Sequence, residues 1–209
     1  MMLEIKFQNI SKMNKNLTYI SANVISILFN PYCLILLLLS SFYFLNTGFR
    51  ISFFEYAIYS FLNFYLPVII IAVFIKLKYI SDFEITDVRE RFNYFSIVTF
   101  LVFLSFIISY LLHSSISSFL FAFSLLNLFT TIISKFYKIS GHLAFDTLIL
   151  WVLFSGFQNI WFLIIETIIL CLVAWSRIML KKHTLDQVIL GTLLGLLSIL
   201  IYQICLNNL

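Results

Sequence analysis

The chain has 209 residues, of which 62% are hydrophobic, 19% aromatic and 11% charged, and its formal net charge is +4. A soluble domain of this size cannot bury so much apolar surface, so the composition excludes the soluble globular class. The mean hydropathy of +1.06 instead predicts an integral membrane protein that crosses the bilayer several times.

Six or seven segments are apolar enough and long enough to cross a membrane. They are expected at residues 24–46, 57–77, 94–112, 116–134, 142–157, 159–178 and 184–206. The short segment 142–157 could lie partly at the interface. Because the runs are continuously apolar, we predict an all-α polytopic bundle of six to seven transmembrane helices. In the last segment, Gly191 and Gly195 form a small-xxx-small pair, which predicts close packing against another helix.

No linker, repeat or soluble insertion divides the chain, so we expect a polar N-terminal segment, 1–23, followed by a single membrane domain, 24–209. Cys33, Cys171 and Cys205 all lie in apolar segments and lack the spacing of a metal site or a disulfide framework. We therefore expect no metal and no cofactor. The expected partners are membrane lipids, with no nucleic acid among them.

Three polar stretches interrupt the apolar sequence, and the order of the spans predicts that they meet. The charged stretch 76–91 follows the second span, Ser140-Gly141-His142 follows the fourth, and the stretch 176–183 follows the sixth. Since an even number of crossings separates them, all three are expected at the same membrane surface.

Most of the basic residues are expected at that surface as well. They are Lys6, Lys12, Lys15, Lys76, Lys78, Lys135, Lys138, Lys181 and Lys182. The opposite surface has little beyond Arg50 and His113. The positive-inside rule would make the lysine-rich face cytoplasmic. A phosphate-binding site would also collect cations, so the count by itself leaves the orientation open.

Two short motifs in the C-terminal half point to a specific chemistry. Residues 139–142 read Ile-Ser-Gly-His, and residues 176–187 contain Ser-Arg-x5-His-x3-Gln. They resemble two motifs of the type 2 phosphatidic acid phosphatase (PAP2) superfamily, Pro-Ser-Gly-His and Ser-Arg-x5-His-x3-Asp. Of that family's first motif, Lys-x6-Arg-Pro, the chain retains Arg91. The resemblance covers about residues 57–206 and rests on the order and spacing of the whole set.

The resemblance implies a metal-independent phosphatase that works through two histidines. His183 would attack phosphorus and form a phosphohistidine. His142 would protonate the leaving lipid alcohol and then activate water, an alternation that suits a pKa near about 6.5. Gln187 would orient His183 in place of the family's aspartate, although a neutral amide cannot stabilise imidazolium as a carboxylate does.

The remaining motif residues would bind the phosphoryl group. Arg91 and Arg177 would clamp its oxygens with planar, permanently charged guanidinium groups. Ser140, Ser176 and the Gly141 amide would add hydrogen-bond donors. The amide is expected at a helix start, where the helix dipole favours an anion.

The first motif departs from the family's pattern. Glu84 stands where the lysine is expected. Either Lys78 reaches the site from a turn or more away, or the site works with fewer cations. Phe92 and Ile139 replace the two prolines, which affects the rigidity of the backbone more than the chemistry.

Two carboxylates lie inside apolar segments, where an isolated charge is costly. Asp146 follows His142 by four residues on the same helical face, so it could orient His142 or add a negative charge to the site. Glu166 is expected either protonated within the bundle or beside a functional cavity.

These residues predict hydrolysis of a lipid phosphate or diphosphate, of the phosphatidate, phosphatidylglycerophosphate, polyprenyl diphosphate or lipid A type. The alternative is a non-hydrolytic lipid-binding or lipid-transporting protein on a degenerate scaffold of the same family. Glu84 and Gln187 favour that alternative, and the two histidines oppose it. A vanadate-dependent peroxidase, which shares the family's site, suits a small membrane-embedded chain poorly.

Overall fold

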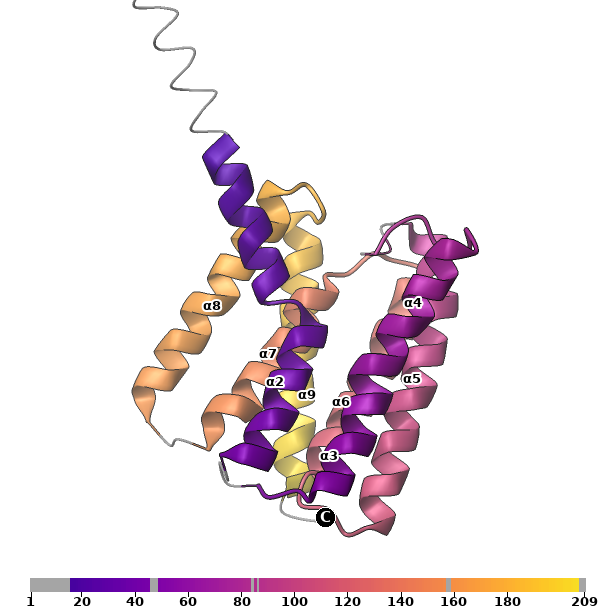
Figure 1. Ribbon diagram of the computed structural model, residues 1–209. Coiled ribbons are helices and arrows are strands. Elements are labelled where there is room, and N and C mark those ends of the chain that lie inside the picture. Colours follow the sequence, from indigo (N-terminus) through magenta and orange to yellow (C-terminus); the bar gives the residue numbers. More distant parts are fainter. Residues whose placement is uncertain (1–15, 46–48, 84, 86, 157–158, 207–209) are drawn as a thin grey trace, which may run out of the picture.

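The computed structural model describes residues 16–45, 49–83, 85, 87–156 and 159–206, and within them every regular element is a helix. Glu84 lies outside the described residues. In chain order the helices are Asn16–Leu28, α2 (Pro31–Phe44), α3 (Phe53–Ser60), the π-helix η1 (Phe61–Tyr65), α4 (Leu66–Lys76), α5 (Val88–Leu111), α6 (Ser117–Ser134), α7 (Gly141–Ser155), α8 (Ile160–Met179) and α9 (Leu185–Leu206) (Figure 1).

Five of the described helices are long and apolar enough to cross a membrane, and a sixth crossing results if the bent pair at the N-terminal end counts as one span. α3, η1 and α4 together form one such span, Phe53–Lys76, of 24 residues. α7 has only 15 residues, about 22 Å at 1.5 Å per residue, which is short of a hydrocarbon core about 30 Å thick. The predicted all-α, multi-pass class is confirmed at this level.

The first apolar segment differs from the single helix expected over 24–46. It consists of the helix Asn16–Leu28 and α2, which are bent by 44° relative to each other. The Asn30 side chain accepts a backbone N–H of α2 at 3.0 Å, and Pro31 occupies the first turn, where a missing N–H costs nothing. Because the residue before a proline is driven out of helical conformation, the same two residues also end the preceding helix.

α6 and α7 form the interior of the bundle. In α6, 67% of the apolar window is buried, compared with 22% in α8 at the edge of the molecule (Figure 1). α7 packs against α2, α8 and α9, and α6 packs against α5 and α9. The first turn of α7 is therefore surrounded by helices that come from both halves of the chain.

The two glycines of α9 allow that helix to approach α7 closely. A Cβ atom at Gly191 would lie 2.5 Å from the backbone oxygen of Ser140, and one at Gly195 would lie 2.6 Å from the Cβ atom of Thr147. Real Cβ atoms do not tolerate such distances, so no larger residue fits here without a shift of the backbone. The close packing predicted from the glycine spacing is present, and it holds Ser140 against α9.

Candidate active site

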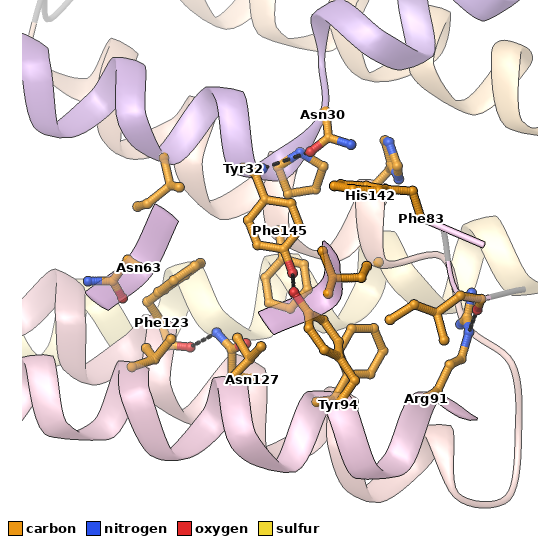
Figure 2. A pocket seen from close by; sticks show the side chains of 18 of the residues that line it. Asn30, Tyr32, Asn63, Phe83, Arg91, Tyr94, Phe123, Asn127, His142 and Phe145 are labelled. Carbon is orange, nitrogen blue, oxygen red and sulfur yellow. Dashed lines mark hydrogen bonds between the residues drawn. The ribbon is translucent and has the colours of Figure 1, made fainter. Parts of the chain in front are cut away.

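Four basic side chains from separate elements line the outer end of one cavity. Arg91 comes from the first turn of α5, His142 from the first turn of α7, Arg177 from the last turn of α8, and His183 from the turn between α8 and α9. All four are between 3% and 9% exposed. The cavity has a volume of about 120 Å³, and Figure 2 shows Arg91 and His142 at the same end of it. The three polar stretches thus meet, as the count of crossings predicted.

Backbone hydrogen bonds fix the Ser140-Gly141-His142 segment between α5 and α9. Arg91 donates from Nη1 to the carbonyl oxygen of Ile139 at 3.1 Å and from Nε to that of Ile85 at 2.7 Å. The backbone N–H of Ser140 donates to the carbonyl oxygen of Gln187 at 3.1 Å. The segment before α7 is therefore anchored from both sides, and α7 begins at Gly141 with Ser140 as its N-cap.

The turn after α8 brings His183 back over the end of that helix. The backbone N–H groups of Lys182 and His183 donate to the carbonyl oxygen of Arg177 at 3.0 and 3.3 Å. These bonds satisfy a carbonyl at the helix C-terminus that has no partner within the helix itself. They also set the imidazole of His183 at the cavity end where the Arg177 guanidinium lies.

Gln187 determines which nitrogen of His183 carries the proton. Its Oε1 atom accepts the backbone N–H of Thr184 at 3.3 Å and lies 3.1 Å from Nδ1 of His183. Because this amide oxygen is an acceptor, Nδ1 must be the donor, and in the neutral imidazole Nε2 then holds a lone pair. That tautomer is the one a nucleophilic histidine needs.

The environment of His183 strongly favours the neutral imidazole. Burial lowers its pKa to about 3, and the nearby Arg177 and Arg91 act in the same direction. The hydrogen bond to Gln187 opposes this shift but does not reverse it. At neutral pH the Nε2 lone pair is therefore available, because no proton competes for it.

We expect this shift to make the protein less stable in mild acid. Below about pH 6.5 the unfolded chain protonates this histidine, whereas the folded chain does so only near about pH 3, so stability falls as the pH falls through that range. Melting curves of the detergent-solubilised protein should show a smaller acid-induced drop for His183→Asn than for the wild type. His113→Asn, at an exposed position, is the control. Equal drops in the wild type and His183→Asn would contradict the prediction.

The N-terminal part of the chain also reaches the basic cluster, which consists of Arg91, His142, Arg177 and His183. Arg177 donates from Nη1 to the hydroxyl oxygen of Ser26 at 2.6 Å, and Nε2 of His142 lies 3.3 Å from the carbonyl oxygen of Ser26. A carbonyl oxygen can only accept, so Nε2 of His142 is the donor in this contact. Ser26 lies outside both motifs, and nothing in the sequence pattern marked it as part of the site.

Lys138 is a second residue that the motifs missed. It is half-buried in the connection before α7. Burial lowers its pKa, as does the positive charge of the nearby Arg91 and Arg177. Lys78, one of the two alternatives for the missing lysine of the first motif, is exposed after α4 and does not line the cavity. Its position in the sequence, two residues before Ser140, is the one feature that could have indicated that Lys138 lies near the site.

Replacing Lys138 with glutamine should weaken the binding of an anion at this end of the cavity several-fold. The reason is that a partly buried cation close to both guanidinium groups adds to their attraction for negative charge. The measurement is the inhibition constant of orthovanadate, with Lys135→Gln as the matched control. Lys135 is exposed, with its Nζ atom 5.5 Å from the centre of the Phe92 ring. If Lys138→Gln and Lys135→Gln have equal effects, Lys138 does not serve the site.

The other expected site residues lie behind the cavity wall. Ser140 is fully buried, and its hydroxyl has no hydrogen-bond partner among the described residues. The Ser176 hydroxyl donates to the carbonyl oxygen of Val173 at 2.9 Å, one turn back in its own helix, so it does not offer that hydrogen to the cavity.

Asp146 is fully buried, and neither carboxylate oxygen has a described hydrogen-bond partner. The bond from Asp146 that was expected to orient His142 is thus not seen. Glu166 is buried as well and does not line the cavity.

The cavity continues from the basic cluster into the middle of the bundle. α5 lines it with Arg91, Tyr94, Val98 and Val102, at the steps of three and four residues that mark one face of a helix. From Arg91 to Val102 the helix rises about 16 Å, close to half of a hydrocarbon core about 30 Å thick. Halfway along, the hydroxyls of Tyr32 and Tyr94 meet at 2.5 Å (Figure 2).

Two asparagines mark the inner end of the cavity, Asn63 from η1 and Asn127 from α6 (Figure 2). Nδ2 of Asn63 donates to the hydroxyl of Ser105 at 2.8 Å, and Nδ2 of Asn127 donates to the carbonyl oxygen of Phe123 at 2.9 Å. Between the basic cluster and these amides the wall consists mainly of aromatic and aliphatic side chains. The cavity therefore combines a cationic outer end with a long apolar interior.

Within the described residues, no group of three or more histidine, cysteine, aspartate or glutamate side chains is placed to hold a metal ion. The side chains that line the outer end of the cavity include two guanidinium and two imidazole groups, which suit an anion. Comparisons with protein-family models, with curated proteins and with solved structures found no match to this chain.

Proposed function

We propose that the protein hydrolyses a lipid phosphate or diphosphate through a phosphohistidine, without a metal ion. One observation carries this proposal: two guanidinium groups and two imidazoles from four separate elements surround the outer end of a cavity whose interior is apolar. A phosphoryl group fits the cationic end, and a hydrocarbon chain fits the interior. The motif resemblance to type 2 phosphatidic acid phosphatases supports the same assignment.

In the first step His183 attacks the phosphorus atom with the lone pair on Nε2. An N–P bond forms, the P–O bond to the lipid alcohol breaks, and His142 gives its proton to the leaving oxygen. In the second step water attacks phosphorus and transfers a proton to His142. The N–P bond breaks, inorganic phosphate leaves, and both histidines return to their initial states.

Arg91 and Arg177 stabilise the charge that builds up on the phosphoryl oxygens. Each guanidinium stays ionised and offers donors in one plane, a geometry that matches two oxygens at once. Both groups are almost fully buried, so solvent screens their attraction for phosphate less than it would at the surface. The Gly141 amide, at the first position of α7, adds a donor at a helix N-terminus.

The depth of the cavity indicates how the lipid is held. With its phosphate at the interface, one hydrocarbon chain would extend about 16 Å along α5, as far as it does within one leaflet. The proposed substrate is therefore a lipid that can insert one chain between α2, α5 and α6.

The test is phosphate release by the detergent-purified protein from phosphatidate, phosphatidylglycerophosphate, a polyprenyl diphosphate and a lipid A phosphate, with EDTA present. We expect release from at least one of these lipids, undiminished by the chelator and inhibited by orthovanadate. If a folded protein released phosphate from none of them, or only without EDTA, the proposal would be wrong.

A further inference from the structure

The helix Asn16–Leu28 lies before the region that resembles the phosphatase family, yet it packs directly on the basic cluster. Ala22 and Ser26, one turn apart, are 0% and 3% exposed, so they define the face turned to the bundle. On the same side Ile25 and Phe29 pack on a small apolar cluster from α7, α8 and α9. That cluster consists of Leu143, Val173 and Val188.

Ser26 makes contacts that an ordinary helical serine does not make. Buried serines commonly donate to a carbonyl one turn back in their own helix, as Ser176 does to Val173 at 2.9 Å and Ser124 does to Phe121 at 2.7 Å. Ser26 instead accepts from Nη1 of Arg177 at 2.6 Å. Its backbone carbonyl lies 3.3 Å from Nε2 of His142. One residue therefore holds two groups of the proposed site.

The bend after this helix explains why Ser26 is available. The chain turns by 44° between Leu28 and Pro31. An unbroken helix would continue in the direction of α2, whereas the bend turns the helix Asn16–Leu28 toward α7 and α8. Asn30 and Pro31, which cap and begin α2, thus determine where Ser26 lies.

We propose that Ser26 is a positioning residue of the active site, which fixes the Arg177 guanidinium through its hydroxyl and the His142 ring through its carbonyl. This inference rests on the proposed function and adds the N-terminal helix to the catalytic apparatus. An arginine side chain has several rotatable bonds, and a charge-assisted hydrogen bond at 2.6 Å restricts it to one orientation before the anion arrives. The conformational entropy of the Arg177 side chain is then lost when the protein folds and not when the anion binds.

Ser26→Ala separates the two contacts, because it removes the hydroxyl and keeps the carbonyl. We expect phosphate and orthovanadate to bind about tenfold more weakly, equivalent to about 1.4 kcal/mol. KM should rise while kcat changes little, because the His142 ring keeps its contact with the carbonyl oxygen of Ser26. Ser26→Thr, which retains a hydroxyl, should restore most of the affinity. Ser21→Ala is the matched control, since Ser21 is exposed on the same helix and its hydroxyl donates to the carbonyl oxygen of Thr18 at 2.9 Å.

A second variant acts on the whole helix. Ala22→Leu places a larger side chain at a position that is 0% exposed, which should push the helix away from α7 and α8. Both contacts of Ser26 should then be lost together, so kcat should fall as well as affinity. A melting curve for each variant shows whether the bundle remains folded.

Anion binding is measured directly by titrating inorganic phosphate and orthovanadate into the full-length protein in detergent, besides the hydrolysis assay. If lipid phosphates are not hydrolysed but Ser26→Ala weakens phosphate binding and Ser26→Thr restores it, the proposed reaction fails and the role of Ser26 stands. If hydrolysis occurs but Ser26→Ala binds phosphate as tightly as the wild type, the role of Ser26 is overturned. A lower melting temperature with unchanged anion affinity would overturn it too.

Discussion

Replacing His183 with alanine is expected to abolish phosphate release in the presence of EDTA while leaving the protein folded. The residue supplies the lone pair that attacks phosphorus in the first step, and removal of a nucleophile commonly costs on the order of 10⁴-fold or more. The side chain is buried at the end of the cavity and not in the apolar core, so its loss should have little effect on helix packing. The measurement is the initial rate on the best lipid substrate.

The matched control is His113→Ala. His113 is exposed in the turn after α5, at the end of that helix opposite to Arg91, and its removal should not change the rate. An activity that survived in His183→Ala would exclude a phosphohistidine at this position. If neither the wild type nor His183→Ala hydrolysed a lipid phosphate, but both bound or moved lipids equally well, the non-hydrolytic alternative would replace the phosphatase.

Gly191→Ala is expected to reduce both stability and activity. Its new Cβ atom would lie 2.5 Å from the backbone oxygen of Ser140, so α9 and the start of α7 must separate. Overpacking of this kind commonly costs about 1–3 kcal/mol of stability. The displaced segment carries Gly141 and His142, and a shift of about 1 Å at reacting groups can cost about 100-fold in rate. The melting temperature and kcat/KM of the purified variant test both effects.

Two other glycines provide the comparison. Gly195→Ala meets backbone and side-chain atoms of Ala144 and Thr147 at 2.7 and 2.6 Å, one turn deeper in the bundle. It should lower stability similarly but reduce activity less below its melting temperature. In Gly141→Ala, the new Cβ would meet only the ring of Phe145, at 3.7 Å, so the fold should accept it. A normal rate for Gly191→Ala would show that the Ser140 contact does not position the site.

The sequence by itself determined the class of the protein and the position of most of its helices. In lipid, the backbone N–H and C=O groups of a continuously apolar segment find hydrogen-bond partners within a helix. The number of crossings between two polar stretches then determines whether those stretches share a membrane face. One contact between near neighbours in the chain was also predicted. Gln187, in the first turn of α9, follows His183 by four residues, and its amide oxygen lies 3.1 Å from the imidazole.

The tertiary structure decided what local spacing does not encode. Ser26 and Arg177 are 151 residues apart in the chain, and their contact depends on the direction of the bend at Asn30-Pro31. Lys78 and Lys138 were both expected on the lysine-rich face, but only the path of each connection determines which cation approaches the two arginines. Periodicity and motif spacing report the shape of one element at a time. The relative placement of elements follows from side-chain packing between them, as at Gly191, where the absence of a side chain sets the distance between α9 and Ser140.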